Sequence, residues 1–147
     1  MAGRPILVAV DFAEASRRAL EAARAIAAGV GAPIVLVHVY RMPLYSYPSI
    51  DPAPLPPPSV FEPEIDAAAR RALAAFAVSV GLPASSTLVR EGEPADEILA
   101  AAAAIGARMI VVGTHGRHGL SRVLLGSVAV DLVRRATVPV LTVRVPA

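Results

Sequence analysis

A glycine-rich stretch near the C-terminal end decides the fold: Gly113-Thr114-His115-Gly116, then nine residues, then Gly126-Ser127. It follows an apolar run at 109–112, which predicts a strand, and it leads into a helix-like segment at 128–136. Glycines let a backbone approach a phosphate closely, and the free N–H groups at a helix N-terminus attract one. The stretch therefore predicts a strand, a loop and a helix that bind a nucleotide phosphate.

The spacing matches neither of the two common phosphate motifs. The sequence lacks Gly-Lys-Ser/Thr, and it lacks Gly-x-Gly-x-x-Gly. Without a ligand, Gly113 and Gly116 would simply form a tight turn, and Ser127 would cap the helix. In the loop, Arg117 and Arg122 would either neutralise phosphate charge or remain solvated. His115 and His118 lack a third ligand and make a poor metal site.

Apolar runs alternate with helix-like stretches along the whole chain. The predicted strands are 5–10, 33–39, 85–90, 109–112 and 138–145. The predicted helices are 14–30, 61–80, 94–105 and 127–136. Strands that are apolar throughout predict an α/β fold, with an open parallel sheet covered by helices on both faces. We expect residues 1–147 to form a single domain.

The segment 40–58 holds seven prolines and interrupts this alternation. We interpret it as a surface loop or lid over the carboxyl ends of the strands, and a solvated insertion without a role is the alternative. Tyr40, Tyr45 and Tyr47 flank or lie in this segment, where a solvated or partner-facing role is favoured over stacking on a base.

The composition excludes several classes of protein. The chain has 55% hydrophobic residues, yet it has no apolar run of the ~20 residues that a membrane span needs. Its N-terminus shows no targeting segment, so a cytoplasmic location is expected. It has no cysteine, which excludes disulfides and thiolate metal sites. A net charge of +2 gives little support for nucleic-acid binding.

Asp11 follows the first predicted strand, and Gly113 follows or ends the fourth. Ligands of open parallel sheets lie at the carboxyl ends of the strands. If these two strands are neighbours, Asp11 faces the glycines and would either hydrogen-bond a ribose hydroxyl or hold a Mg²⁺ that bridges phosphates. Alternatively, Asp11 caps the first helix with Glu14 as its capping-box partner. His38 lies within an apolar strand and is expected to be a core residue.

The sequence resembles the universal stress protein family over nearly all of its length except about 40–58. The resemblance rests on the spacing of Gly113, Gly116, Gly126 and Ser127, on the segment 109–144, on Ile6-LVAV-Asp11 and on Gly92-EPADEI-Leu99. It implies the strand order 3-2-1-4-5, which makes the first and fourth strands neighbours. It also implies an ATP-binding regulatory module of the stress response, and a homodimer built through the fifth strand.

The resemblance also implies a role for individual residues. Asp11 would lie near the ribose, Ala9 and Val10 would line the base and sugar, and Val39 would meet adenine through its backbone. The phosphates would be wrapped by four residues and flanked by two more: Gly113, Gly116, Gly126 and Ser127, then Val112 and Val128. Ala13 departs from the family, since many relatives have a capping serine there, and capping would then fall to Asp11.

Two other functions remain open. One is a slow ATPase or phosphotransferase that uses the same pocket, and the other is an interaction protein with an empty pocket. The chain contains no lysine, so arginine and Mg²⁺ would have to neutralise the charge of a transferred phosphoryl group. Binding without rapid turnover is therefore favoured.

Overall fold

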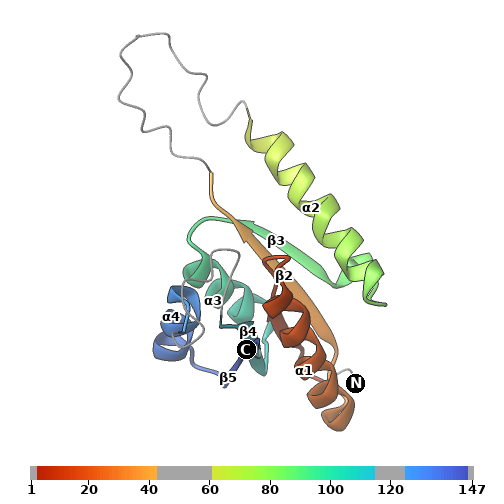
Figure 1. Ribbon diagram of the computed structural model, residues 1–147, viewed down its shortest axis with the longest axis vertical. Coiled ribbons are helices and arrows are strands. Elements are labelled where there is room, and N and C mark those ends of the chain that lie inside the picture. Colours follow the sequence, from red (N-terminus) through yellow and green to blue (C-terminus); the bar gives the residue numbers. More distant parts are fainter. Residues whose placement is uncertain (1–2, 43–60, 115–124, 146–147) are drawn as a thin grey trace.

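The computed structural model describes residues 3–42, 61–114 and 125–145. These residues form one sheet of five parallel strands in the order β3-β2-β1-β4-β5, which confirms the predicted α/β fold and strand order (Figure 1). The strands are β1 (Ile6–Ala9), β2 (Ile34–Tyr40), β3 (Thr87–Glu91), β4 (Met109–Gly113) and β5 (Val140–Val143). The helices are α1 (Glu14–Val30), α2 (Glu62–Ser79), α3 (Pro94–Ile105) and α4 (Ser127–Arg135), and a 3-10 turn, η2 (Ala84–Ser86), precedes β3.

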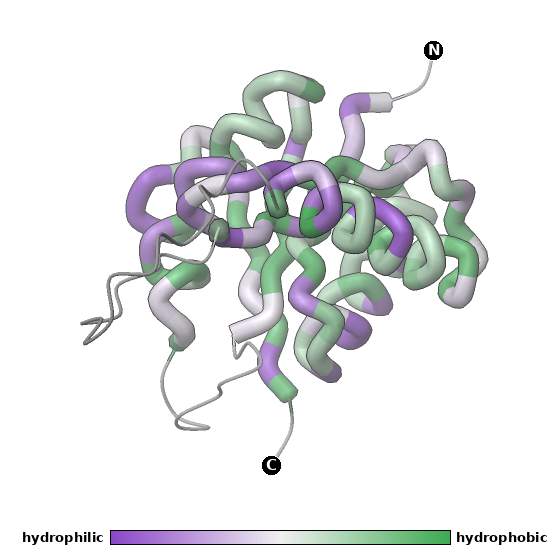
Figure 2. Tube along the Cα trace, turned by 90° about the horizontal axis from the view of Figure 1, so that it is seen from above, coloured by the Kyte–Doolittle hydropathy of each residue, from purple (hydrophilic) through white to green (hydrophobic). Residues whose placement is uncertain are grey.

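Helices cover both faces of the sheet because successive strand residues point to opposite faces. On one face, α1 and α2 bury a set that we name the α1/α2 core, whose strand members include Ile6, Val8, Leu36 and Val111. On the other face, α3 and α4 bury the α3/α4 core, whose strand members include Leu7, Val37, Ile110 and Val112. Figure 2 shows hydrophobic residues along the strands and hydrophilic residues interspersed along the helices.

Local signals fix most element boundaries. The helices predicted at 14–30 and 94–105 agree with α1 and α3, since Gly31 and Gly106 take left-handed conformations (φ of 64° and 62°) just after them. The strand predicted at 85–90 begins later, at Thr87, because η2 occupies the preceding residues. The strand predicted at 138–145 is shorter, because Pro139 has no N–H to extend the ladder.

All five strands point the same way, so their carboxyl ends meet at one edge of the sheet. We call this the carboxyl edge. The chain leaves it toward Asp11 after β1, toward Arg41 after β2 and toward Thr114 after β4. It is the edge at which open parallel sheets bind their ligands.

Candidate functional site

The two strands that carry the predicted site are neighbours. Val8 of β1 lies opposite Val111 of β4. Asp11, three residues after Val8, and Gly113, two residues after Val111, therefore both lie at the carboxyl edge. The condition set by the sequence analysis, that the first and fourth strands are neighbours, is therefore met.

The glycine loop, which we define as residues 113–127, is closed at its base. The Gly126 N–H donates to the Thr114 carbonyl at 2.6 Å, and the Thr114 N–H donates to the Val143 carbonyl of β5 at 3.0 Å. Thr114 itself is 1% exposed. The loop thus leaves β4 and returns beside it to begin α4. The predicted residues Gly116 and Arg117 lie outside the described residues, as do His115, His118 and Arg122.

The N-terminus of α4 is capped by Gly126, not by Ser127 as the ligand-free alternative supposed. Gly126 has no side chain that could accept the first helical N–H groups, and Ser127 is the exposed first residue of the helix. An α-helix leaves its first N–H groups without intrahelical partners. The first N–H groups of α4 follow Gly126 and include that of Ser127, one of the residues expected to wrap the phosphates.

Packing alone also requires the two described glycines. A Cβ at Gly113 would come within 2.6 Å of the Ala15 Cβ, in the first turn of α1. A Cβ at Gly126 would come within 2.8 Å of the Thr114 carbonyl oxygen. Gly113 thus lets α1 approach β4 closely, and Gly126 lets the loop close on itself. Sequence reasoning missed these contacts, because Ala15 is far from the glycines along the chain.

Asp11 forms a tight turn with the start of α1. Its carboxylate oxygen Oδ1 accepts hydrogen bonds from the Ala13 N–H at 3.0 Å and from the Ser16 hydroxyl at 2.6 Å. Ala13 is the N-cap and has no capping side chain, so Asp11 does satisfy an N–H at this helix start. The expected capping box does not form. Glu14 is the first helical residue and pairs instead with Arg18 at 3.5 Å.

Phe12 supports this turn in an uncommon conformation. Its φ is 65°, a left-handed value that is rare for a bulky residue and marks local strain. The Phe12 ring packs on His38 at 4.7 Å and on Phe76 at 5.9 Å between ring centroids. His38 Nδ1 lies 2.7 Å from the Val10 carbonyl oxygen. His38 is therefore a half-buried packing residue, as the sequence indicated.

Four of the predicted apolar site residues share one face of the sheet, packed in or against the α3/α4 core: Ala9, Val39, Val112 and Val128. Val10 does not join them. Its side chain is 4% exposed and belongs to the α1/α2 core on the opposite face. The Val10 side chain therefore lies away from the face that carries Ala9, because neighbouring strand residues alternate between faces. That Val10 lines the base and sugar stays a prediction, which its backbone would have to meet.

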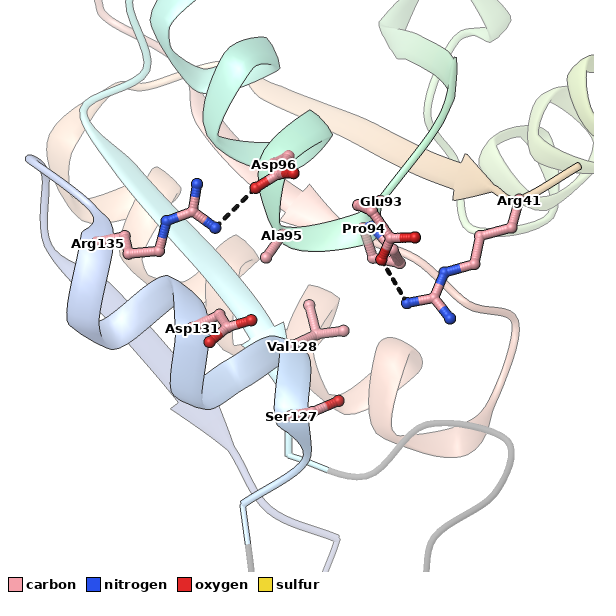
Figure 3. A pocket seen from close by; sticks show the side chains of 9 residues that line it. All are labelled: Arg41, Glu93, Pro94, Ala95, Asp96, Ser127, Val128, Asp131 and Arg135. Atoms are coloured by element: carbon pink, nitrogen blue, oxygen red, sulfur yellow. Dashed lines mark hydrogen bonds and ion pairs between the residues drawn. The ribbon is translucent and has the colours of Figure 1, made fainter.

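A pocket of about 130 Å³ opens at the carboxyl edge between the first turn of α3 and one side of α4 (Figure 3). It shares Ser127 and Val128 with the predicted site, and α3 and its preceding residue contribute Glu93, Pro94, Ala95 and Asp96. Ion pairs between Arg41 and Glu93 at 2.8 Å and between Arg135 and Asp96 at 2.7 Å flank it. Both pairs are exposed, so each adds little stability.

Tyr40 turns toward α2. Its hydroxyl donates to Asp66 Oδ1 at 3.0 Å, and Arg70 donates to Asp66 Oδ2 at 2.6 Å. Burial, with the bond to Asp66, raises the pKa of the Tyr40 hydroxyl to about 12. The hydrogen bond from Arg70 lowers the pKa of the Asp66 carboxyl. Tyr40 thus joins the end of β2 to α2, while Tyr45 and Tyr47 lie outside the described residues.

Residues 3–144 match the model of the universal stress protein family. The chain is 32% identical to a universal stress protein of Thermus aquaticus, over 96% of this chain and 98% of the relative. The chain belongs to the universal stress protein family.

Solved universal stress proteins share this fold. UspA of Lactobacillus plantarum has a TM-score of 0.73 at 26% identity, with 98% of this chain and 99% of that chain covered. A universal stress protein solved in complex with cAMP has a TM-score of 0.60 at 25% identity, with 98% of each chain covered. Family membership makes this chain a stress-response protein.

Two further features of this universal stress protein concern function classes. In the described part of the chain, no helix combines the length and apolarity needed to cross a membrane. In the same residues, no cluster of three or more histidine, cysteine or acidic side chains could hold a metal ion.

The sequence and the family resemblance had already indicated Asp11 and the glycines. No signal in the sequence indicated Ser16 or the pocket residues Arg41, Glu93 and Asp131.

Proposed function

We propose that this universal stress protein binds ATP at the carboxyl edge and acts as a nucleotide-dependent regulatory module. One observation carries the proposal: Asp11, the described ends of the glycine loop and the N-terminus of α4, which has no side-chain cap, gather at one edge of the sheet. A carboxylate, a close backbone approach and a helix N-terminus are the groups that a ribose and its phosphates need.

The apolar face beside this edge suits an adenine base. Ala9, Val39 and Val128 are partly buried against the α3/α4 core, and Val128 also lines the pocket between α3 and α4. Binding sites for small molecules combine such apolar walls with a few polar groups. The relative solved with cAMP supports an adenine nucleotide as the ligand class. Gly116 and Arg117 complete the proposed phosphate site.

We further propose binding without rapid turnover. The Asp11 carboxylate already accepts two hydrogen bonds through Oδ1, which suits it to hold a sugar in place. Mg²⁺ would be held chiefly by the phosphates, since a single remaining oxygen of Asp11 is a small contribution to its coordination. The proposal includes a cytoplasmic location and a homodimer paired through β5.

The proposal is tested by identifying what the purified protein carries. Protein purified without added nucleotide is denatured by heat, and the released small molecules are identified by mass spectrometry. We expect an adenine nucleotide, with ATP the main species. Release of no nucleotide, together with no uptake of ATP by the protein before heating, would contradict the proposal.

A further inference from the structure

Ser16 is one of two polar side chains that are buried in the described part of the chain, with 3% of its surface exposed. It lies in the first turn of α1, and both of the described hydrogen bonds of its hydroxyl involve Asp11. The Ser16 hydroxyl donates to Asp11 Oδ1 at 2.6 Å, and it accepts the Asp11 backbone N–H at 2.9 Å. Ser16 therefore holds the backbone and the carboxylate of Asp11 at once.

These bonds give the two carboxylate oxygens of Asp11 different environments. The Ser16 hydroxyl and the Ala13 N–H both reach Oδ1. Among residues 3–42, 61–114 and 125–145, none donates a described hydrogen bond to Oδ2. A carboxylate fixed through one oxygen keeps a single orientation and presents the other oxygen as an acceptor.

The turn that carries Asp11 needs such support. Phe12 holds a φ of 65°, which persists only where surrounding contacts enforce it. Ala13, the N-cap of α1, has no polar side chain with which to stabilise the turn. Gly113 also lets Ala15 approach β4 closely, so the first turn of α1, which carries Ser16, is packed against the site.

We infer that Ser16 is a positioning residue, which orients Asp11 so that Oδ2 accepts a hydrogen bond from a ribose hydroxyl. Ser16 thereby sets the preference of the site for a ribonucleotide over one that lacks sugar hydroxyls. The inference rests on the proposed function. It goes beyond ATP binding, because it assigns the sugar selectivity of the site to a residue that does not touch the ligand.

The experiment compares two ligands by calorimetric titration: ATP and 2′,3′-dideoxy-ATP, which lacks both ribose hydroxyls. Each is titrated into the wild type, into Ser16→Ala and into Ser79→Ala. Ser79 is a matched control, since its hydroxyl donates to the Phe76 carbonyl at 2.7 Å at the far end of α2. If Ser16→Ala does not fold, Ser16→Cys replaces it, because a thiol is a weaker donor of similar size.

We expect Ser16→Ala to bind ATP about tenfold more weakly than the wild type, the loss of one hydrogen bond to a charged group. Its affinity for dideoxy-ATP should equal that of the wild type, and Ser79→Ala should behave as the wild type with both ligands. An equal loss for both ligands would overturn the inference, because it would show a merely structural role. An unchanged ATP affinity would also overturn it. A wild type that binds neither ligand would instead contradict the proposed function itself.

Discussion

Gly113 serves two purposes at one position. The family resemblance assigns it to the phosphates, whereas the structure gives it a contact with Ala15 that any side chain would disturb. A substitution at Gly113 therefore changes the packing of α1 as well as the proposed site. Loss of nucleotide binding in such a variant is not by itself evidence for a phosphate contact.

We predict that Gly113→Ala lowers the free energy of unfolding by about 1–3 kcal/mol, the usual effect of inserting atoms into a packed site. Gly29→Ala is the matched control. Gly29 lies within α1, and a Cβ there would meet no atom within 4 Å. The control should gain up to about 1 kcal/mol from the higher helix propensity of alanine.

Urea unfolding of the two variants and the wild type measures both effects. A Gly113→Ala protein as stable as the wild type would show that α1 can move away from β4 at little cost. The close approach of Ala15 would then no longer explain this glycine.

At the scale of elements, Tyr40 links the end of β2 to α2 across the proline-rich segment. Its folded-state pKa of about 12 lies above the value of about 10 for an exposed tyrosine, so folding favours the protonated hydroxyl. This contribution to stability is complete below pH 10 and is lost as the pH rises toward 12.

We predict that an ultraviolet absorbance titration of the wild type, minus that of Tyr40→Phe, has its midpoint near pH 12. Tyr40→Phe should also lower stability by about 1 kcal/mol, the net contribution of one hydrogen bond. A difference curve with its midpoint near pH 10 would mean that the Tyr40 hydroxyl is neither buried nor bonded to Asp66 in solution.

β5 is an edge strand of the sheet, and this position suits the adjoining Pro139, which has no N–H to donate. The Pro139 carbonyl accepts a hydrogen bond from the Ile110 N–H of β4, and the Val143 carbonyl accepts one from the Thr114 N–H just after β4. The backbone groups of Pro139 and Val143 therefore point toward β4. Thr142 is out of step with Pro139 and Val143 in this alternation, so its backbone N–H and C=O point toward the open edge of the sheet. Leu141 packs against the α1/α2 core, which makes it a poor position at which to test pairing.

We expect the wild type to run as a dimer of twice 15.1 kDa in size-exclusion chromatography with light scattering. Thr142→Pro removes an outward N–H and should shift the protein toward monomer, whereas Thr142→Val keeps the N–H and should remain dimeric. A wild-type monomer at micromolar concentration would contradict pairing through β5, as would a dimeric Thr142→Pro protein.

At the scale of the whole molecule, the sequence predicted the elements well, because glycines and prolines mark their ends locally. The order of the strands came from the family resemblance, since apolar runs do not encode which strands pair. Asp11 and Gly126 could be indicated from the sequence, because Asp11 directly follows a predicted strand and Gly126 belongs to the spaced glycines. The role of Ser16 and the Ala15 contact could not, because each depends on how α1 packs on the sheet.

The central claim is that the carboxyl edge binds ATP, and titration calorimetry on nucleotide-free protein tests it most directly. We predict saturable binding of one ATP per chain with a dissociation constant in the micromolar range, about −8 kcal/mol. Asp11→Ala should weaken this binding about tenfold, because the ribose loses its charged acceptor. Absence of saturable binding up to millimolar ATP would contradict the account.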